Sequence, residues 1–162
     1  MSTQPASLRS ALADRRIIAV VRAADDGDAE VIARAAAEGG LRAVEITTSV
    51  PGAAALISTL RGSLADDVLV GAGTVLSLGQ LDDVLAAGAQ FVVSPGLDRL
   101  LVERCAATQV SFLPGVLTPT EVMAGQGMGL DALKLFPSDT AGPDHLRALR
   151  SVFRSQFSPE EA

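Results

Sequence analysis

Residues 39–47 run Gly-Gly-Leu-Arg-Ala-Val-Glu-Ile-Thr, a pair of glycines followed by alternating apolar and polar side chains. Glycine is favoured just after a helix because it adopts the left-handed turn there at low steric cost. The alternation at Val44-Glu45-Ile46 is typical of a β strand. The same succession, from a helix-ending glycine to a β-rich run, recurs over residues 88–93 and 127–134. This repeat indicates that helices and strands alternate along the chain.

The alternation extends over most of the 162 residues. Runs rich in β-branched and aromatic residues predict strands at 17–21, 43–47, 68–70, 91–93, 110–113 and 132–136. Alanine-rich runs predict helices at 7–14, 28–38, 52–61, 78–87, 97–107, 119–126 and 143–153. Strand–helix alternation of this kind is typical of an α/β architecture with a parallel sheet.

The residues that end the expected strands are almost evenly spaced, which favours a (β/α) barrel over a doubly wound sheet. They are Glu45, Thr74, Pro95, Pro114 and Phe136. The pattern gives six strand–helix units within residues 1–153, whereas a complete TIM-type barrel has eight. We therefore expect an incomplete (β/α) barrel over 1–153, followed by a frayed tail at 154–162. An open sheet of this kind exposes two edges.

Composition excludes several classes of protein. With 48% hydrophobic and 20% charged residues, the chain has the composition of a globular domain. A net charge of −6 and the lack of a basic stripe argue against a nucleic-acid partner. No apolar run is long enough for a membrane span, and the N-terminus does not resemble a signal peptide.

Cysteine and histidine each occur once, as Cys105 and His145. They are too few to build a zinc site, so we expect no metal of that kind. A lone cysteine is consistent with a reducing, cytoplasmic location. We expect Cys105 to fill the core of a helical layer and His145 to lie at the surface.

Lys134 is the only lysine, against twelve arginines. Side chains alternate along a strand, so Leu133 and Leu135 face one way and Lys134 the other. With the leucines packed on helices, Lys134 points into the barrel at the strand's carboxyl end, where such barrels place their active sites. Apolar surroundings favour a neutral amine, which attacks a carbonyl to form a Schiff base. The alternative is a lysine whose ammonium group reaches solvent.

Glu45 occupies an equivalent position on the second strand. Val44 and Ile46 face one side of that strand, while Glu45 and Thr47 face the other. A carboxylate that points into a barrel is costly unless it is paired or functional. Opposite a lysine it is suited to general acid–base catalysis. The alternative is a buried ion pair with Lys134 or an arginine.

Other strand ends carry weaker signals. Arg22 follows the first strand, where it either faces an anionic substrate or is an exposed rim charge. Gly71-Ala72-Gly73-Thr74 ends the third strand without forming a dinucleotide fingerprint, because Leu76 stands where the third glycine belongs. Thr74 either donates a hydrogen bond to a carboxylate or acts as a cap or turn residue. We expect Ser94-Pro95-Gly96 and Leu113-Pro114-Gly115 to be rigid turns.

Five short motifs follow one another at the spacing of β/α units. They are Val44-Glu45-Ile46-Thr47, Gly71-Ala72-Gly73-Thr74-Val75, Ser94-Pro95-Gly96, Leu113-Pro114-Gly115 and Leu133-Lys134-Leu135-Phe136-Pro137-Ser138. The set resembles the class I aldolases that act on 2-keto-3-deoxy-6-phosphogluconate and its galactonate epimer. The resemblance covers about residues 8–153.

The resemblance implies a trimeric (β/α)8 barrel that cleaves the phosphorylated keto-deoxy sugar acid to pyruvate and glyceraldehyde 3-phosphate. Lys134 matches the Schiff-base lysine of that family and Glu45 its proton-shuttling glutamate. Thr74 matches a residue near the pyruvate carboxylate, and Pro95 and Phe136 match walls of the pocket. No metal or organic cofactor is implied, and the partners are the small-molecule substrate and further copies of the chain.

Two departures from the family pattern stand out. Some members carry an arginine four residues after the glutamate, where this chain has Ser49, so that Arg22 is the candidate replacement. The family's phosphate site follows strands seven and eight, which are absent from the six expected units. We therefore expect a C-terminally truncated barrel with weak affinity for phosphorylated substrates.

The alternative is a catalytically impaired homologue that acts as a structural or association fragment through its sheet edges. A metal-dependent epimerase barrel is disfavoured, since such barrels use several histidines.

Overall fold

The computed structural model describes Leu8, Leu12 and residues 16–153. The helix expected at 7–14 and the tail expected at 154–162 lie largely outside the described residues. Six parallel strands form one sheet in chain order. Their bounds are β1 (Ala19–Val21), β2 (Ala43–Thr47), β3 (Leu69–Gly73), β4 (Phe91–Ser94), β5 (Ser111–Val116) and β6 (Lys134–Leu135).

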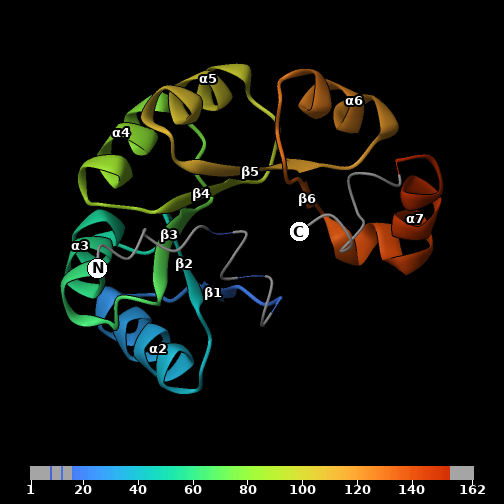
Figure 1. The fold of residues 1–162 in the computed structure, drawn as a ribbon. Coiled ribbons are helices and arrows are strands. Elements are labelled where there is room, and N and C mark those ends of the chain that lie inside the picture. Colours follow the sequence, from blue (N-terminus) through green and yellow to red (C-terminus); the bar gives the residue numbers. More distant parts are fainter. Residues whose placement is uncertain (1–7, 9–11, 13–15, 154–162) are drawn as a thin grey trace, which may run out of the picture.

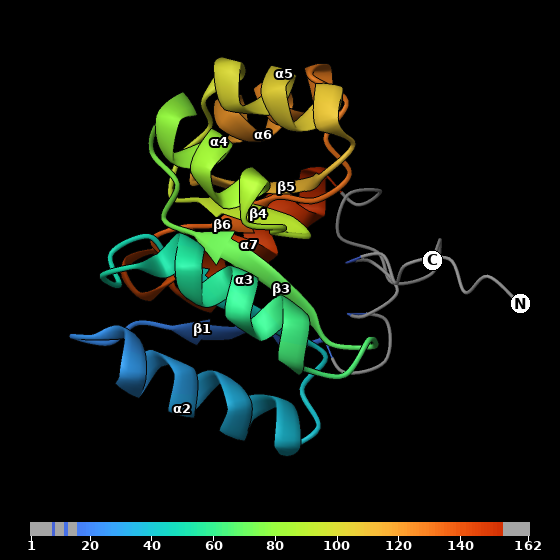
Figure 2. The ribbon, with the colours of Figure 1, turned by 90° about the vertical axis from the view of Figure 1, so that its left-hand side faces the viewer.

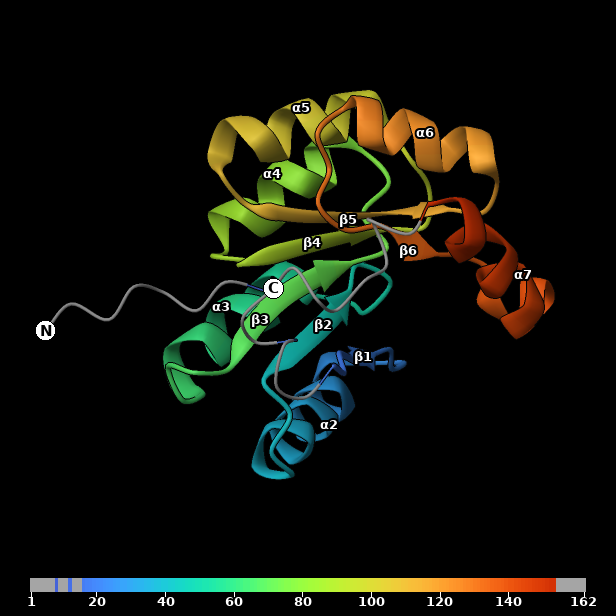
Figure 3. The same ribbon diagram turned by 45° about the vertical axis from the view of Figure 1, so that its right-hand side comes forward.

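A helix follows each strand. The helices are α2 (Asp26–Glu38), α3 (Ala53–Ser63), α4 (Leu78–Ala86), α5 (Arg99–Thr108), α6 (Pro119–Gly127) and α7 (Ser138–Val152). The strands curve through an arc, and the helices lie along its outer side (Figure 1). Seen from the side, α2, α3 and α4 stand in a row against the first strands (Figure 2). Figure 3 shows α4, α5 and α6 covering β4 and β5 from one side.

The sheet is an open half-barrel, as the sequence predicts. Within the described residues β1 pairs only with β2, and β6 pairs only with β5. The two edge strands contain three and two residues, whereas the central strands β2 and β3 contain five each. The expected incomplete (β/α) barrel is therefore confirmed in its six parallel units.

Alternation along the strands separates two apolar layers. Outward-facing residues such as Val44, Ile46 and Val70 pack against the helices in one large buried cluster. Residues on the opposite face form a second, smaller cluster inside the arc: Leu8, Ala43, Leu69, Phe91 and Val93. Burial on both faces explains why β3, with the sequence LVGAG, and β4, with the sequence FVVS, lack the apolar–polar contrast of a half-exposed sheet.

Polar side chains begin most of the helices at the carboxyl ends of the strands. Asp25, Ser77 and Asp98 each accept a hydrogen bond from a backbone N–H in the first turn of the following helix. Thr118 and Glu121 form a capping box that starts α6. Such caps satisfy amide groups that would otherwise lack partners, and they fix where each strand–helix loop ends.

One expectation about local structure is wrong, and another is met with an addition. Leu113-Pro114-Gly115 is not a turn, because β5 continues through it to Val116. Pro114 still fits, since proline at a strand position needs only that no partner requires its missing N–H. The helix expected at 143–153 is present as the second part of α7. It is preceded by a short helical segment that starts at Ser138, and the two parts are separated at Gly142, whose φ of 71° and ψ of 172° are not helical.

Candidate active site

Lys134 lies on the inward face of β6, as its sequence position predicts. Its neighbours Leu133 and Leu135 pack into an apolar cluster with Val116 of β5, Val122 of α6 and Leu149 of α7. Lys134 therefore projects to the opposite side, and it is half-buried. Its Nζ lies 5.2 Å from the centroid of the Phe136 ring, a cation–π distance.

Glu45 is 2% exposed and projects from the centre of β2. Its carboxylate rests over the backbone of β3, in space that is open because residue 73 is glycine. A Cβ built on Gly73 would lie 2.5 Å from Glu45 Cδ and closer still to Oε1. Gly73 therefore makes room for the carboxylate, and any side chain there would displace it.

The electrostatics of Glu45 link it to two basic residues. Burial raises the pKa of its carboxyl above the usual value, while the charges of Lys134 and then Arg22 oppose that rise. Desolvation is the largest of these effects, because it disfavours the charged form. The inward faces of β2 and β6 thus bring a buried carboxylate within electrostatic range of the only lysine, from strands about 90 residues apart.

Arg22 and Thr74 contact each other at the mouth of the half-barrel, which is the end of the sheet where the carboxyl ends of β1 and β3 lie. Arg22 Nη2 donates a long hydrogen bond of 3.5 Å to Thr74 Oγ1. The Thr74 carbonyl accepts a hydrogen bond of 2.6 Å from Thr48 Oγ1, and Thr74 has a positive φ of 59°. Ser77, not Thr74, caps α4, so the interpretation of Thr74 as a helix cap is wrong.

Ser49 contacts its own strand rather than the rest of the candidate site. Its Oγ lies 2.9 Å from Thr47 Oγ1, and the residue is exposed at the carboxyl end of β2. Arg22, whose side chain is exposed, is the arginine whose charge opposes the rise in the pKa of Glu45.

Pro95 follows β4 and Phe136 follows β6, so the two residues come from the two strands that flank β5. Pro95 lines an open depression of about 340 Å³ beside the start of α5. Its carbonyl packs so closely on Gly115 that a Cβ there would clash with the backbone of Pro95. Gly115 is in turn the register partner of Lys134. Phe136 is 42% exposed, and its ring lies beside Lys134 Nζ.

The residues that converge are Lys134, Glu45, Arg22, Thr74 and Phe136. A model of the family described as "KDPG and KHG aldolase" matches residues 8–160. The chain belongs to this aldolase family.

Individual aldolases of the family give the same result. The 2-dehydro-3-deoxy-phosphogluconate aldolase of Treponema pallidum is 41% identical over 127 residues, which are 78% of this chain and 60% of that protein. The corresponding aldolase of Zymomonas mobilis is 39% identical over 137 residues, 83% of this chain and 65% of that protein. The chain thus spans 60–65% of the length of these two relatives.

A solved aldolase has the same fold. The KDPG aldolase of Legionella pneumophila, with pyruvate captured as a covalent carbinolamine intermediate, superposes with a TM-score of 0.83 at 36% identity. The match covers 94% of this chain and 73% of that structure. The half-barrel therefore corresponds to part of the aldolase barrel in architecture as well as in sequence.

Several features of this aldolase-family chain were missed or misplaced by sequence reasoning. His145 is not at the surface but half-buried, with Nε2 2.6 Å from the carbonyl oxygen of Leu117. A helical spacing of four residues from the buried Leu149 is the signal that points to it. Gly73 and Gly115 are required by close packing, for which only the strand position of glycine gives a hint.

Other expectations are met or carry no conclusion. Cys105 is buried in α5, as expected for core filling, and burial raises the pKa of its thiol to about 11. Over residues 16–153, no three His, Cys, Asp or Glu side chains gather in a way that would hold a metal ion. The helices of the described residues are all too short or too polar to cross a bilayer.

Proposed function

We propose that this chain is a class I aldolase in which Lys134 forms a Schiff base with a 2-keto acid and Glu45 transfers protons. The proposed substrate is 2-keto-3-deoxy-6-phosphogluconate or its galactonate epimer, cleaved to pyruvate and glyceraldehyde 3-phosphate. One observation carries the proposal: the only lysine of the chain and a buried glutamate project from the inward faces of β6 and β2 in the same half-barrel. Membership of the aldolase family supports it.

The chemistry needs a lysine that can lose its proton. The neutral amine of Lys134 adds to the C2 carbonyl, and loss of water from the carbinolamine gives an iminium ion. When the C4 hydroxyl gives its proton to Glu45, the C3–C4 bond breaks and its electron pair flows into the iminium as an enamine. Glu45 then returns a proton to C3, and water hydrolyses the resulting imine to release pyruvate.

The environment of Glu45 suits both directions of this transfer. Burial raises the pKa of its carboxyl, so that it holds a proton more readily than an exposed glutamate does. The charges of Lys134 and then Arg22 act in the opposite direction and lower the pKa of the carboxyl. A general acid–base is most effective when both forms are populated near the working pH.

Substrate anchoring is assigned to residues at the mouth of the half-barrel. The exposed guanidinium of Arg22, held beside the Thr74 hydroxyl, offers donors for the substrate carboxylate. Ser49 adds a hydroxyl at the same end of the sheet. Phe136 and Pro95 are the proposed apolar walls.

Trapping with pyruvate tests the lysine directly. The protein is incubated with pyruvate and borohydride, digested and analysed by mass spectrometry, and we expect a reduced pyruvate adduct on Lys134. Pyruvate carries no phosphate, so the experiment does not depend on a phosphate site. Lys134→Arg is the matched control, because a guanidinium keeps the charge but does not attack a carbonyl. A folded protein that gains no adduct at Lys134 contradicts the proposal.

The edges of the sheet favour a second candidate function, that of an association fragment. β1 and β6 each pair on one side only within residues 16–153, and unpaired edges promote association with other chains. A homotrimer is the assembly proposed from the family resemblance. Light scattering separates the candidates: stable oligomers without pyruvate trapping favour the fragment, whereas a monodisperse monomer that traps pyruvate argues against it.

A further inference from the structure

Two consecutive carbonyl groups at the end of β5 hold the segment that carries Lys134. The carbonyl of Val116 accepts a hydrogen bond of 3.0 Å from the N–H of Phe136, just after β6. The next carbonyl, that of Leu117, accepts a bond of 2.6 Å from His145 Nε2. A carbonyl only accepts, so Nε2 carries the hydrogen. The chain is thus bound to the end of β5 before α7 starts, and to the loop after β5 within α7.

The acceptor carbonyl of Leu117 belongs to a loop that is itself fixed. The Glu121 carboxylate accepts hydrogen bonds from the N–H groups of Leu117, at 2.9 Å, and Thr118, at 2.7 Å. These bonds lower the pKa of Glu121 and close the capping box of α6. His145 therefore binds a point that α6 already holds in place.

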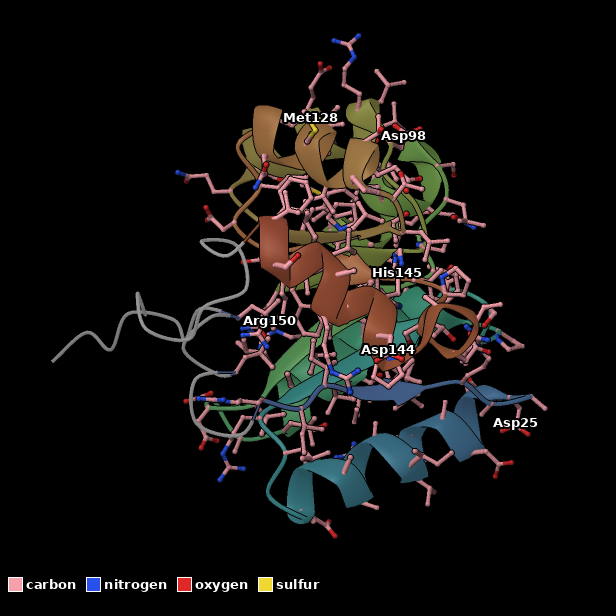
Figure 4. The ribbon with its side chains drawn as sticks, turned by 90° about the vertical axis from the view of Figure 1, so that its right-hand side faces the viewer. Asp25, Asp98, Met128, Asp144, His145 and Arg150 are labelled. Atoms are coloured by element: carbon pink, nitrogen blue, oxygen red, sulfur yellow. The ribbon has the colours of Figure 1, made fainter. Side chains whose placement is uncertain are left out.

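The shape of α7 places His145 at that point. The helix breaks at Gly142 and resumes at Pro143, where a missing N–H costs nothing in a first turn. His145 lies in this turn and Leu149 one turn later, on the same face. Leu149 is buried against Val116 and Val122. Figure 4 shows α7 from the outside, with His145 near its restart and Arg150 further along.

We propose that His145 is a positioning residue for Lys134: its hydrogen bond to Leu117 fixes α7, and through it β6, against β5. This inference rests on the proposed function, since it assigns a role in holding the Schiff-base amine toward Glu45. β6 contains only two residues and pairs with β5 alone within the described residues. An edge strand this short needs support from the helix that follows it, and Lys134 is its first residue.

Replacement variants separate the hydrogen bond from the bulk of the side chain. His145→Leu removes the donor and keeps an apolar side chain, whereas His145→Gln offers an amide N–H at about the reach of Nε2. Arg150→Ala controls for surface changes on the same helix, since Arg150 is exposed. Ile57→Val controls for a general loss of stability, because Ile57 is fully buried in α3, away from β6.

Two readouts follow for each variant. The first is the borohydride trapping rate at increasing pyruvate, which separates the maximal rate from the half-saturating concentration. The second is amide hydrogen exchange at Phe136, whose N–H is bonded to Val116. We expect His145→Leu to lower the maximal rate and to speed this exchange, each about tenfold, with the half-saturating concentration unchanged. His145→Gln should keep both readouts close to those of the natural chain. Arg150→Ala and Ile57→Val should not combine a lower maximal rate with faster exchange at Phe136.

Three results would overturn the inference: unchanged exchange at Phe136 in His145→Leu, faster exchange with unchanged trapping, or an equal effect in Ile57→Val at a matched melting temperature. A natural chain that traps no pyruvate overturns the proposed function instead. In that event the exchange at Phe136, which requires no reaction, decides whether His145 holds β6.

Discussion

The two halves of the candidate site are built in opposite ways. Glu45 lies on β2, a five-residue strand that is buried throughout and paired with strands on both sides. Lys134 lies on β6, a half-buried strand of two residues that pairs with β5 alone in the described part of the chain. Packing positions the carboxylate, whereas a few hydrogen bonds and one aromatic ring position the amine. Substitutions in the two halves should therefore act by different routes.

The largest loss of stability is expected from Gly115→Ala, at the register partner of Lys134. The new Cβ would collide with the carbonyl of Pro95, and a backbone group does not move aside cheaply. We expect a loss of about 3 kcal/mol in the free energy of unfolding, at the upper end of overpacking costs. Urea denaturation with an unchanged slope measures this loss.

A matched glycine provides the control. Gly62 lies in α3, and a methyl group added to its Cα would meet no heavy atom within 4 Å apart from its chain neighbours and the nearby backbone of its own helix, so Gly62→Ala should raise stability by about 0.5 kcal/mol. Equal midpoints for Gly115→Ala and Gly62→Ala would show that β5 and Pro95 are free to move apart.

A smaller loss of stability but a large loss of reactivity is expected from Gly73→Ala. Here the new Cβ meets the end of the Glu45 side chain, which rotates away at a cost of about 1 kcal/mol. The displaced carboxylate no longer faces Lys134, so the maximal rate of pyruvate trapping should fall by about 100-fold. Stopped reactions at saturating pyruvate give this rate. A trapping rate close to that of the natural chain would remove Glu45 from the proton transfers.

The smallest effects concern the pH dependence of stability. The contributions of Glu45, on β2, and of Glu121, on α6 near β6, should change with pH in opposite directions. Burial raises the folded-state pKa of Glu45, so the folded protein holds this proton more tightly than the unfolded chain. The stability contribution of Glu45 therefore falls as pH rises above its unfolded pKa of about 4.3. Glu45→Gln should flatten this decline and stabilise the protein at neutral pH.

Glu121 should behave in the reverse manner. Backbone hydrogen bonds from Leu117 and Thr118 lower its pKa, so its contribution is present above the unfolded pKa and is lost as pH falls through the folded one. Glu121→Gln should remove part of the stability at neutral pH and little in acid, and solvent screening keeps the change small. Urea midpoints between about pH 3 and about pH 8 measure both variants. If the two substitutions changed the urea midpoint with pH in the same direction, the two carboxylates would share one kind of environment.

Local patterns in the sequence were sufficient for the architecture and for the inward direction of the Glu45 and Lys134 side chains. Even spacing of strand ends predicted the six parallel units, because each β/α repeat needs a similar length of chain. Alternation in Val44-Glu45-Ile46 and Leu133-Lys134-Leu135 predicted which side chains face inward, since side-chain direction in a strand has a period of two. Both conclusions follow from local patterns.

The features that local patterns missed depend on contacts between distant segments. Pro114-Gly115 looked like a turn, but Gly115 is inside β5 because the backbone of Pro95 packs on it. His145 looked like a surface residue, but its partner is the carbonyl of Leu117, 28 residues earlier. Residue-by-residue propensities carry no information on such pairs, so these positions were found only in the folded chain.

Gly71, the register partner of Glu45 on β3, and Phe91 on β4 share one packing volume inside the half-barrel. The Phe91 ring fills the space that Gly71 leaves empty, with its carbon atoms 2.5–2.6 Å from where a Cβ would stand. Neither residue can be replaced by a larger or smaller one without a compensating change in the other. The packing on the inward face beside Glu45 is therefore set by two positions together, so a larger residue at 71 requires a smaller side chain at 91.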